Sequence, residues 1–72
     1  MSPSTLRHLW HLIEKTQGSI LLSMDDQGLV QWLISQFQQE QALDPQETNY
    51  IQNYLNSRLL LIRDLAQERM AT

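Results

Sequence analysis

Two histidines form the first group of residues that could do chemistry. His8 and His11 lie three residues apart, so on a helix both imidazole rings could bind one metal ion. Arg7 and Lys15 make their surroundings cationic, and Glu14 is the only further ligand at helical spacing. We therefore expect two surface histidines with no bound metal, and we expect no cofactor.

A pair of carboxylates forms the second group. Asp25 and Asp26 could act as acid and base, or could bind Mg²⁺. Adjacent residues on a helix point about 100° apart, and two acids suit the start of a helix. No serine–histidine–aspartate set, glycine-rich phosphate loop or cofactor motif accompanies them. The sequence therefore predicts that the chain is not an enzyme.

A narrow basic stripe forms the third group. Arg7, His11 and Lys15 recur every four residues and so share one side of a helix. One interpretation is docking onto an acidic partner or a phosphate. The other, which we favour, is a solvated face that meets Asp25 and Asp26 on a neighbouring helix.

Length and composition limit the elements that position these groups. The chain has 72 residues, of which 42% are hydrophobic and 18% charged, so we expect a single domain over residues 1–72. It has no cysteine, which excludes disulfides, and its net charge of −3 disfavours binding to nucleic acid or to a membrane surface. No apolar run approaches the roughly 18 residues of a membrane span. We expect a cytoplasmic protein.

Hydrophobic residues recur with the period of a helix along the chain. We predict an all-α fold with helices over residues 3–17, 24–41 and 45–69. Short loops between three helices favour an up-down-up bundle. The apolar residues 20–22 would form a bent segment or a single turn over the core.

Residues with strong positional preferences set the first boundaries. Ser2 or Ser4 is expected to cap the first helix, and Gly18 to end it in a left-handed conformation. Ser23 is expected to cap the second helix, with Asp26 in place of the usual glutamate of a capping box.

The third predicted helix is long for this chain. Asp44 and Glu47 form a capping box at its start, and at 1.5 Å per residue the helix would span about 37 Å. Asn56 and Ser57 are weak helix formers, so a kink or break at these two residues is the alternative.

An arginine lies within the apolar stripe of this third helix. The stripe and the two arginines that project from it are Ile51, Tyr54, Leu55, Arg58, Ile62, Leu65 and Arg69. An unpaired buried charge is costly. One explanation is local: Arg58 extends its guanidinium to solvent, or pairs with Asp26 or Glu40 of the same chain. The other is that Arg58 binds a carboxylate of a second chain.

Four consecutive apolar residues also point to an interface. Residues 59–62 cover every direction of a helix, so Leu60 points away from the stripe, and Trp32 lies at the flank of the second helix. We predict a partner-binding surface that consists of Trp32, Arg58, Leu59, Leu60, Leu61, Ile62 and Arg63.

These features predict a non-enzymatic protein–protein interaction module that forms a homodimer through its third helix. Arg58 or Arg63 would fix the register through a charge pair. One alternative is a monomeric regulator or assembly subunit that docks this helix on a larger complex. Another is a small DNA-binding regulator, which is disfavoured because residues 45–58 contain no Lys or Arg before the last one.

Three segments resemble a known group of proteins. Leu22–Asp26, Leu29–Leu33 and Ser57–Ala66 are similar to segments of short, uncharacterised all-helical proteins of cyanobacteria. The resemblance covers most of the chain and implies a bacterial cytoplasm. It implies no activity and carries over no functional residues.

Overall fold

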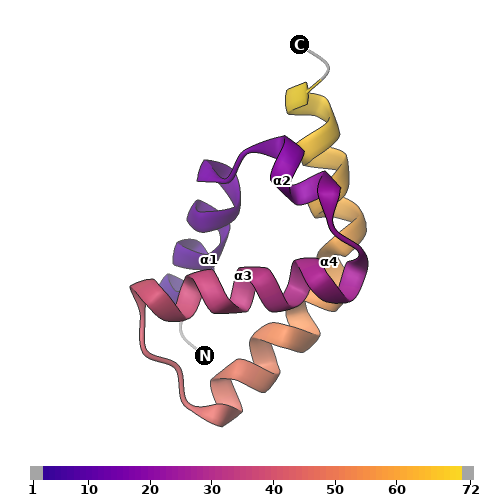
Figure 1. Ribbon diagram of the computed structural model, residues 1–72. Helices are drawn as coiled ribbons and strands as arrows, with labels where there is room; N and C mark the ends of the chain where they lie inside the picture. The colour runs from indigo at the N-terminus through magenta and orange to yellow at the C-terminus, as the bar shows by residue number, and fades with distance from the viewer. Residues whose placement is uncertain (1–2, 71–72) are drawn as a thin grey trace.

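The computed structural model describes residues 3–70, and all regular structure in that range is α-helical. Its elements are α1 (Pro3–Lys15), α2 (Gly18–Ser23), α3 (Asp26–Glu40) and α4 (Pro45–Met70) (Figure 1). The prediction of an all-α fold is confirmed. The three-helix up-down-up arrangement is not confirmed, because the connector between the first two predicted helices forms a helix of its own.

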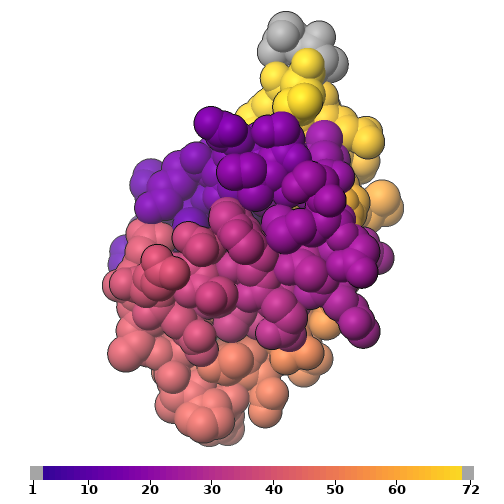
Figure 2. Space-filling model, in the orientation of Figure 1, coloured from indigo at the N-terminus to yellow at the C-terminus, as the bar shows by residue number. Residues whose placement is uncertain are grey.

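The long helix α4 sets the shape of the molecule. In Figure 1, α1 and α4 run in the same direction, α3 crosses in front of them, and α2 lies beside the C-terminal part of α4. A helix as long as α4 spans about 39 Å, and the longest dimension of the molecule is 37 Å. The space-filling view from the same side shows α4 chiefly at the two ends, while α2 and α3 cover the middle (Figure 2).

All four helices contribute to one hydrophobic core. Its buried side chains are Leu9, Leu12, Ile13, Leu21, Leu29, Val30, Leu33, Ile34, Phe37, Ile51, Leu55, Ile62 and Ala66. The four from α4 recur every four or seven residues and so form one stripe. Two residues predicted for this stripe lie beside it instead, since Tyr54 is half-buried and Leu65 is 39% exposed.

The short helix α2 was not foreseen as a helix. Gly18 is its first residue, and no residue within 3–70 has a positive φ, so the predicted left-handed ending at Gly18 is wrong. A β-carbon on Gly18 would lie 2.9 Å from the carbonyl oxygen of Ala66 on α4. Gly18 is therefore needed for the close approach of two helices and not for a turn. Leu21 fixes α2 over the core with 1% of its surface exposed.

The cap of α3 lies two residues later than predicted. Asp25 is the N-cap, and its carboxylate accepts a hydrogen bond from the backbone N–H of Gly28 at 2.8 Å. Ser23 is not the cap, because its hydroxyl donates to the carbonyl of Ile20 at the end of α2. The alternative cap of α1, Ser2, lies outside the described residues.

The capping box at the start of α4 is confirmed. Asp44 accepts from the N–H of Glu47 at 2.7 Å, and the Glu47 carboxylate accepts from the N–H of Asp44 at 3.4 Å. The helix then continues without a break to Met70, so a break at residues 56–57 is wrong. Figure 1 shows α4 changing direction along its length, in keeping with the other alternative, a kink. The hydroxyl of Ser57 donates to the carbonyl of Tyr54 one turn back, which satisfies it inside a continuous helix.

Replacing Gly18 by alanine tests the contact between α2 and α4. The added methyl group would meet the backbone oxygen of Ala66, so α2 must shift away from α4. We expect a loss of about 1–3 kcal/mol in the free energy of unfolding, against a gain of at most about 1 kcal/mol from helix propensity. Urea denaturation measures the difference. Ser19→Ala, at an exposed neighbouring position, is the control, and an unchanged Gly18→Ala variant would contradict the close contact.

Candidate functional site

Arg63 of α4 is bound to the short helices. Its guanidinium donates to the carbonyl of Leu21 at 3.3 Å and to the carbonyl of Met24 at 2.9 Å. It also pairs with Asp26 at 2.9 Å, at the first residue of α3. The last carbonyls of a helix have no partner within the helix. Arg63 therefore supplies donors where α2 ends and α3 begins, and it is not free to fix the register of a partner.

Arg69 plays the same part for α1. Its guanidinium donates to the carbonyl of Glu14 and, at 2.6 Å, to the carbonyl of Thr16. A cation at this position also opposes the negative end of the helix dipole. Two arginines of α4 thus hold the C-terminal ends of α1 and α2.

Arg58 does not make the ion pair within the chain that the sequence predicts as one alternative. Of the two carboxylates proposed for it, Asp26 pairs with Arg63 and Glu40 pairs with Lys15, each at 2.9 Å. These are the ion pairs formed within residues 3–70. The alternative of a local pair for Arg58 is therefore wrong.

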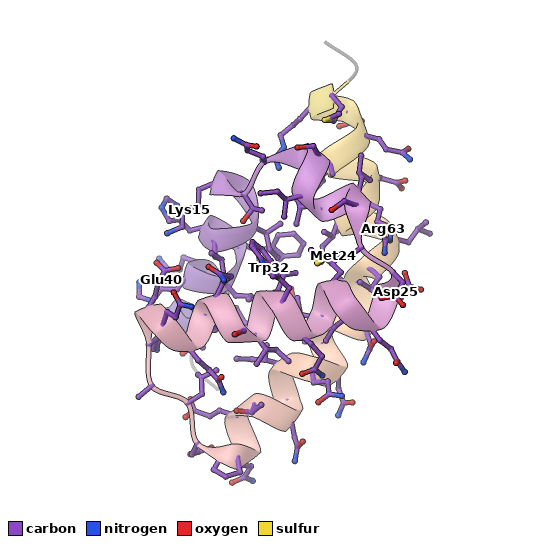
Figure 3. The ribbon with its side chains drawn as sticks, viewed as in Figure 1. Lys15, Met24, Asp25, Trp32, Glu40 and Arg63 are labelled. Atoms are coloured by element: carbon purple, nitrogen blue, oxygen red, sulfur yellow. The ribbon has the colours of Figure 1, made fainter. Side chains whose placement is uncertain are left out.

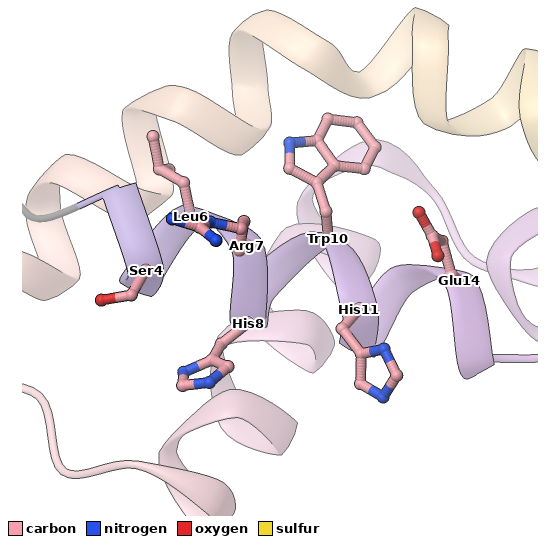
Figure 4. Close-up of a pocket in the computed structure, with 7 residues that line it drawn as sticks. All are labelled: Ser4, Leu6, Arg7, His8, Trp10, His11 and Glu14. Atoms are coloured by element: carbon pink, nitrogen blue, oxygen red, sulfur yellow. The ribbon is translucent and has the colours of Figure 1, made fainter.

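Arg58 lies over an aromatic ring instead. Its guanidinium carbon is 5.2 Å from the centre of the Tyr54 ring, which is a cation–π distance. The Tyr54 hydroxyl accepts a hydrogen bond from the indole N–H of Trp10 at 2.7 Å, and the two rings meet edge to face at 6.4 Å. Trp10 points from α1 toward α4 (Figure 4). The three side chains therefore form one connected row from α1 to α4.

The basic stripe of α1 remains a surface feature. Arg7 and His11 are exposed, and Lys15 bridges to Glu40 on α3 with both side chains about half exposed, at 49% and 46% (Figure 3). The stripe therefore meets the C-terminal end of α3 and not the predicted Asp25 and Asp26. An exposed pair of this kind stabilises the fold by at most about 1 kcal/mol.

The two histidines point away from α4. His8 and His11 lie on the far side of α1 from Trp10, beside an open depression of about 530 Å³ (Figure 4). His8 Nδ1 is 3.4 Å from the amide oxygen of Gln41. Within the part of the chain that the structure describes, no three His, Asp or Glu side chains are placed to hold a metal ion.

Exposed apolar side chains concentrate on one helix. Across residues 3–70, the large hydrophobic side chains with substantial exposure all belong to α4: Tyr50, Leu60, Leu61, Leu65 and Met70. Leu60 is 76% exposed, Leu61 46% and Leu65 39%. The shorter helices cover one side of α4; by helical spacing Tyr50, Leu61 and Leu65 share a second side, while Leu60 and Met70 project from others.

The predicted partner-binding residues separate into two groups. Ile62 is fully buried, Leu59 and Trp32 pack against the core, and Arg63 is bound as described above. Figure 3 shows Trp32 pointing from α3 toward the interior. We remove these four from the partner-facing set, which leaves Arg58, Leu60 and Leu61.

The sequence reasoning missed two residues of this surface. The sequence placed Leu65 and Tyr54 in one apolar stripe with Ile51, Leu55 and Ile62, and did not include them in the partner-binding surface. Only the positions of α1 and α2 around α4 show that the buried stripe is centred on Ile62 and Ala66. No signal in the sequence locates those neighbours.

Comparison of the chain with protein-family models, with curated proteins and with solved structures finds no match in any of the three. The resemblance to cyanobacterial proteins therefore stays a prediction. Among the helices of residues 3–70, none has the length and apolar character that crossing a membrane requires.

Replacing Arg63 by methionine tests its role as a helix-end donor. The carbonyls of Leu21 and Met24 would lose their charged donor, and we expect the free energy of unfolding to fall by about 1–3 kcal/mol. Arg58→Met on the same helix removes the same charge without freeing a carbonyl and loses only the contact with Tyr54, so it should lower stability by no more than about 0.5–1 kcal/mol. Chemical denaturation at low protein concentration compares them. Equal effects would contradict this role of Arg63.

Proposed function

We propose that this protein is a non-enzymatic interaction module that forms a homodimer through α4. The observation that carries the proposal is the exposure of three leucines on one helix: Leu61 and Leu65 share one side of α4, and Leu60, 76% exposed, points about 100° away from Leu61. Exposed apolar side chains that gather on one element mark interaction sites on soluble domains. We place this association in the cytoplasm, in keeping with a chain that has no cysteine.

The residue types around this patch favour a protein partner. Burying one leucine side chain fully contributes about 1.5–3 kcal/mol. Trp10 of α1 and Tyr54 and Arg58 of α4 form a connected row, and Trp, Tyr and Arg are the types enriched at the energetic centres of protein interfaces. The patch is small, so we expect a dimer that dissociates on dilution.

Light scattering over a concentration series tests the proposal with the variant Leu60→Asp/Leu61→Asp. Both positions are exposed, so the fold should tolerate the change, while two carboxylates in the interface would separate the copies. We expect the wild type to approach twice its chain mass of 8.5 kDa as concentration rises. The variant should stay at the mass of one chain.

A second double variant controls for net charge. Ser35→Asp/Gln38→Asp adds the same two charges; Ser35 and Gln38 lie at exposed positions of α3 and should leave dimerisation unchanged. A wild type that is monomeric at every concentration would contradict self-association. The alternative would then be a monomer that docks α4 on a larger complex.

A further inference from the structure

The residues on one side of α4 have the spacing of a coiled-coil seam. Tyr54, Arg58, Leu61, Leu65 and Glu68 follow one another at intervals of four, three, four and three residues. Side chains at these intervals form a single row that faces a partner helix. We call these five residues the α4 seam.

Charge is distributed unevenly along the α4 seam. Arg58 lies toward its N-terminal end, Glu68 at its C-terminal end, and two half-exposed leucines lie between them. Neither Arg58 nor Glu68 takes part in an ion pair within residues 3–70. Arg58 is held over Tyr54, so its guanidinium is already positioned on the seam and loses less freedom on binding.

A surface with a cation at one end, a carboxylate at the other and apolar residues between them is complementary to itself when it is turned end for end. A two-fold dimer whose axis runs across the helices requires this property, because the same patch then faces itself in the opposite direction. A parallel arrangement would place Arg58 against Arg58 of the partner copy and Glu68 against Glu68 of the partner copy. The charge pattern therefore favours an antiparallel pair.

We propose that two copies pair antiparallel through the α4 seam, with the two-fold axis level with residue 63; this inference rests on the homodimer proposed above. Leu61 and Leu65 each lie two residues from that level, about 3 Å along the helix. Each Leu61 therefore packs against the partner's Leu65, and each Leu65 packs against the partner's Leu61. Arg58 and Glu68 lie five residues from it, about 7.5 Å, so each Arg58 faces the partner's Glu68.

Other registers of the antiparallel pair lose one of these matches. Moving the two-fold axis by about one helical turn toward the N-terminus places Arg58 against the partner's Leu61, which leaves the cation beside an apolar side chain. A shift toward the C-terminus places Glu68 against the partner's Leu65. Only the register centred on residue 63 joins leucine to leucine and arginine to glutamate on both sides of the axis.

A small hollow beside the seam fits the same register. It has a volume of about 170 Å³ and is lined by Ile13, Glu14, Leu21, Leu65, Glu68 and Arg69. Its apolar wall consists of Ile13 and Leu21, which belong to the core. In the proposed pair the partner's Leu61 packs beside Leu65 at the edge of this hollow.

A charge-reversal cycle tests the register. Arg58→Glu and Glu68→Arg each place like charges opposite one another, so each should raise the dimer dissociation constant at least about tenfold. The double variant Arg58→Glu/Glu68→Arg restores both pairs in reverse and should return within about threefold of the wild type. Sedimentation equilibrium measures the constants, and circular dichroism confirms that each variant is folded.

The Ser35→Asp/Gln38→Asp variant is the matched control, since it changes the net charge by the same two units as Arg58→Glu. A wild type that never dimerises contradicts the proposed function and this inference together. In a second case Leu60→Asp/Leu61→Asp disrupts the dimer while the single charge reversals leave it unchanged, or while the double reversal fails to restore it. Either result contradicts this inference alone.

Disulfide trapping gives an independent reading of the direction of the pair. The chain has no cysteine, so single cysteines can be placed without background. A mixture of Leu61→Cys and Leu65→Cys chains should oxidise mainly to the mixed dimer, because these two positions face each other. Faster cross-linking of Leu61→Cys to itself than to Leu65→Cys would indicate a parallel pair and overturn the proposal.

Discussion

Backbone carbonyls at the ends of two short helices are the constraint on which this structure depends. A helix of α2's length is unstable alone, because its few hydrogen bonds do not offset the cost of nucleation. Arg63 and Arg69 project from one continuous helix and donate to carbonyls at the ends of α2 and α1. These two side chains stabilise the end of each helix where its own hydrogen bonds are missing, and they attach both helices to α4.

The length of α4 follows from this role and leaves a surplus of surface. A helix that must reach α1, α2 and α3 extends over the whole molecule, and three short helices cannot cover all its sides. Its buried stripe consists of Ile51, Leu55, Ile62 and Ala66; Leu61 and Leu65 beside that stripe, and Leu60 on the far side of the helix, stay in contact with water. A chain of this size buries too little surface to cover them itself. This is the surface that the proposed dimer would bury.

The three arginines of α4 show how similar residues acquire different roles. Arg63 and Arg69 lie where helix ends meet α4, so their donors are used within the chain. Arg58 lies near the middle of α4, where no helix ends, and Tyr54 is its neighbour. The carboxylates that could have neutralised it are held by other cations. An arginine that is positioned by an aromatic ring and lacks an ion pair within residues 3–70 is suited to recognising a carboxylate of another chain.

The sequence by itself determined the features that depend on neighbours along the chain. The helical period, the capping box of Asp44 and Glu47 and the exposure of Leu60 follow from local spacing, and the structure agrees with each of them. Tertiary structure decided the rest. Gly18 begins a helix and lies close to α4, Leu65 of the predicted stripe is 39% exposed, and Asp26 pairs with Arg63 and not with Arg58. These outcomes depend on which side of α4 each short helix covers, and that choice is made by contacts between residues about 40 or more positions apart, such as the hydrogen bonds of Arg63 and Arg69.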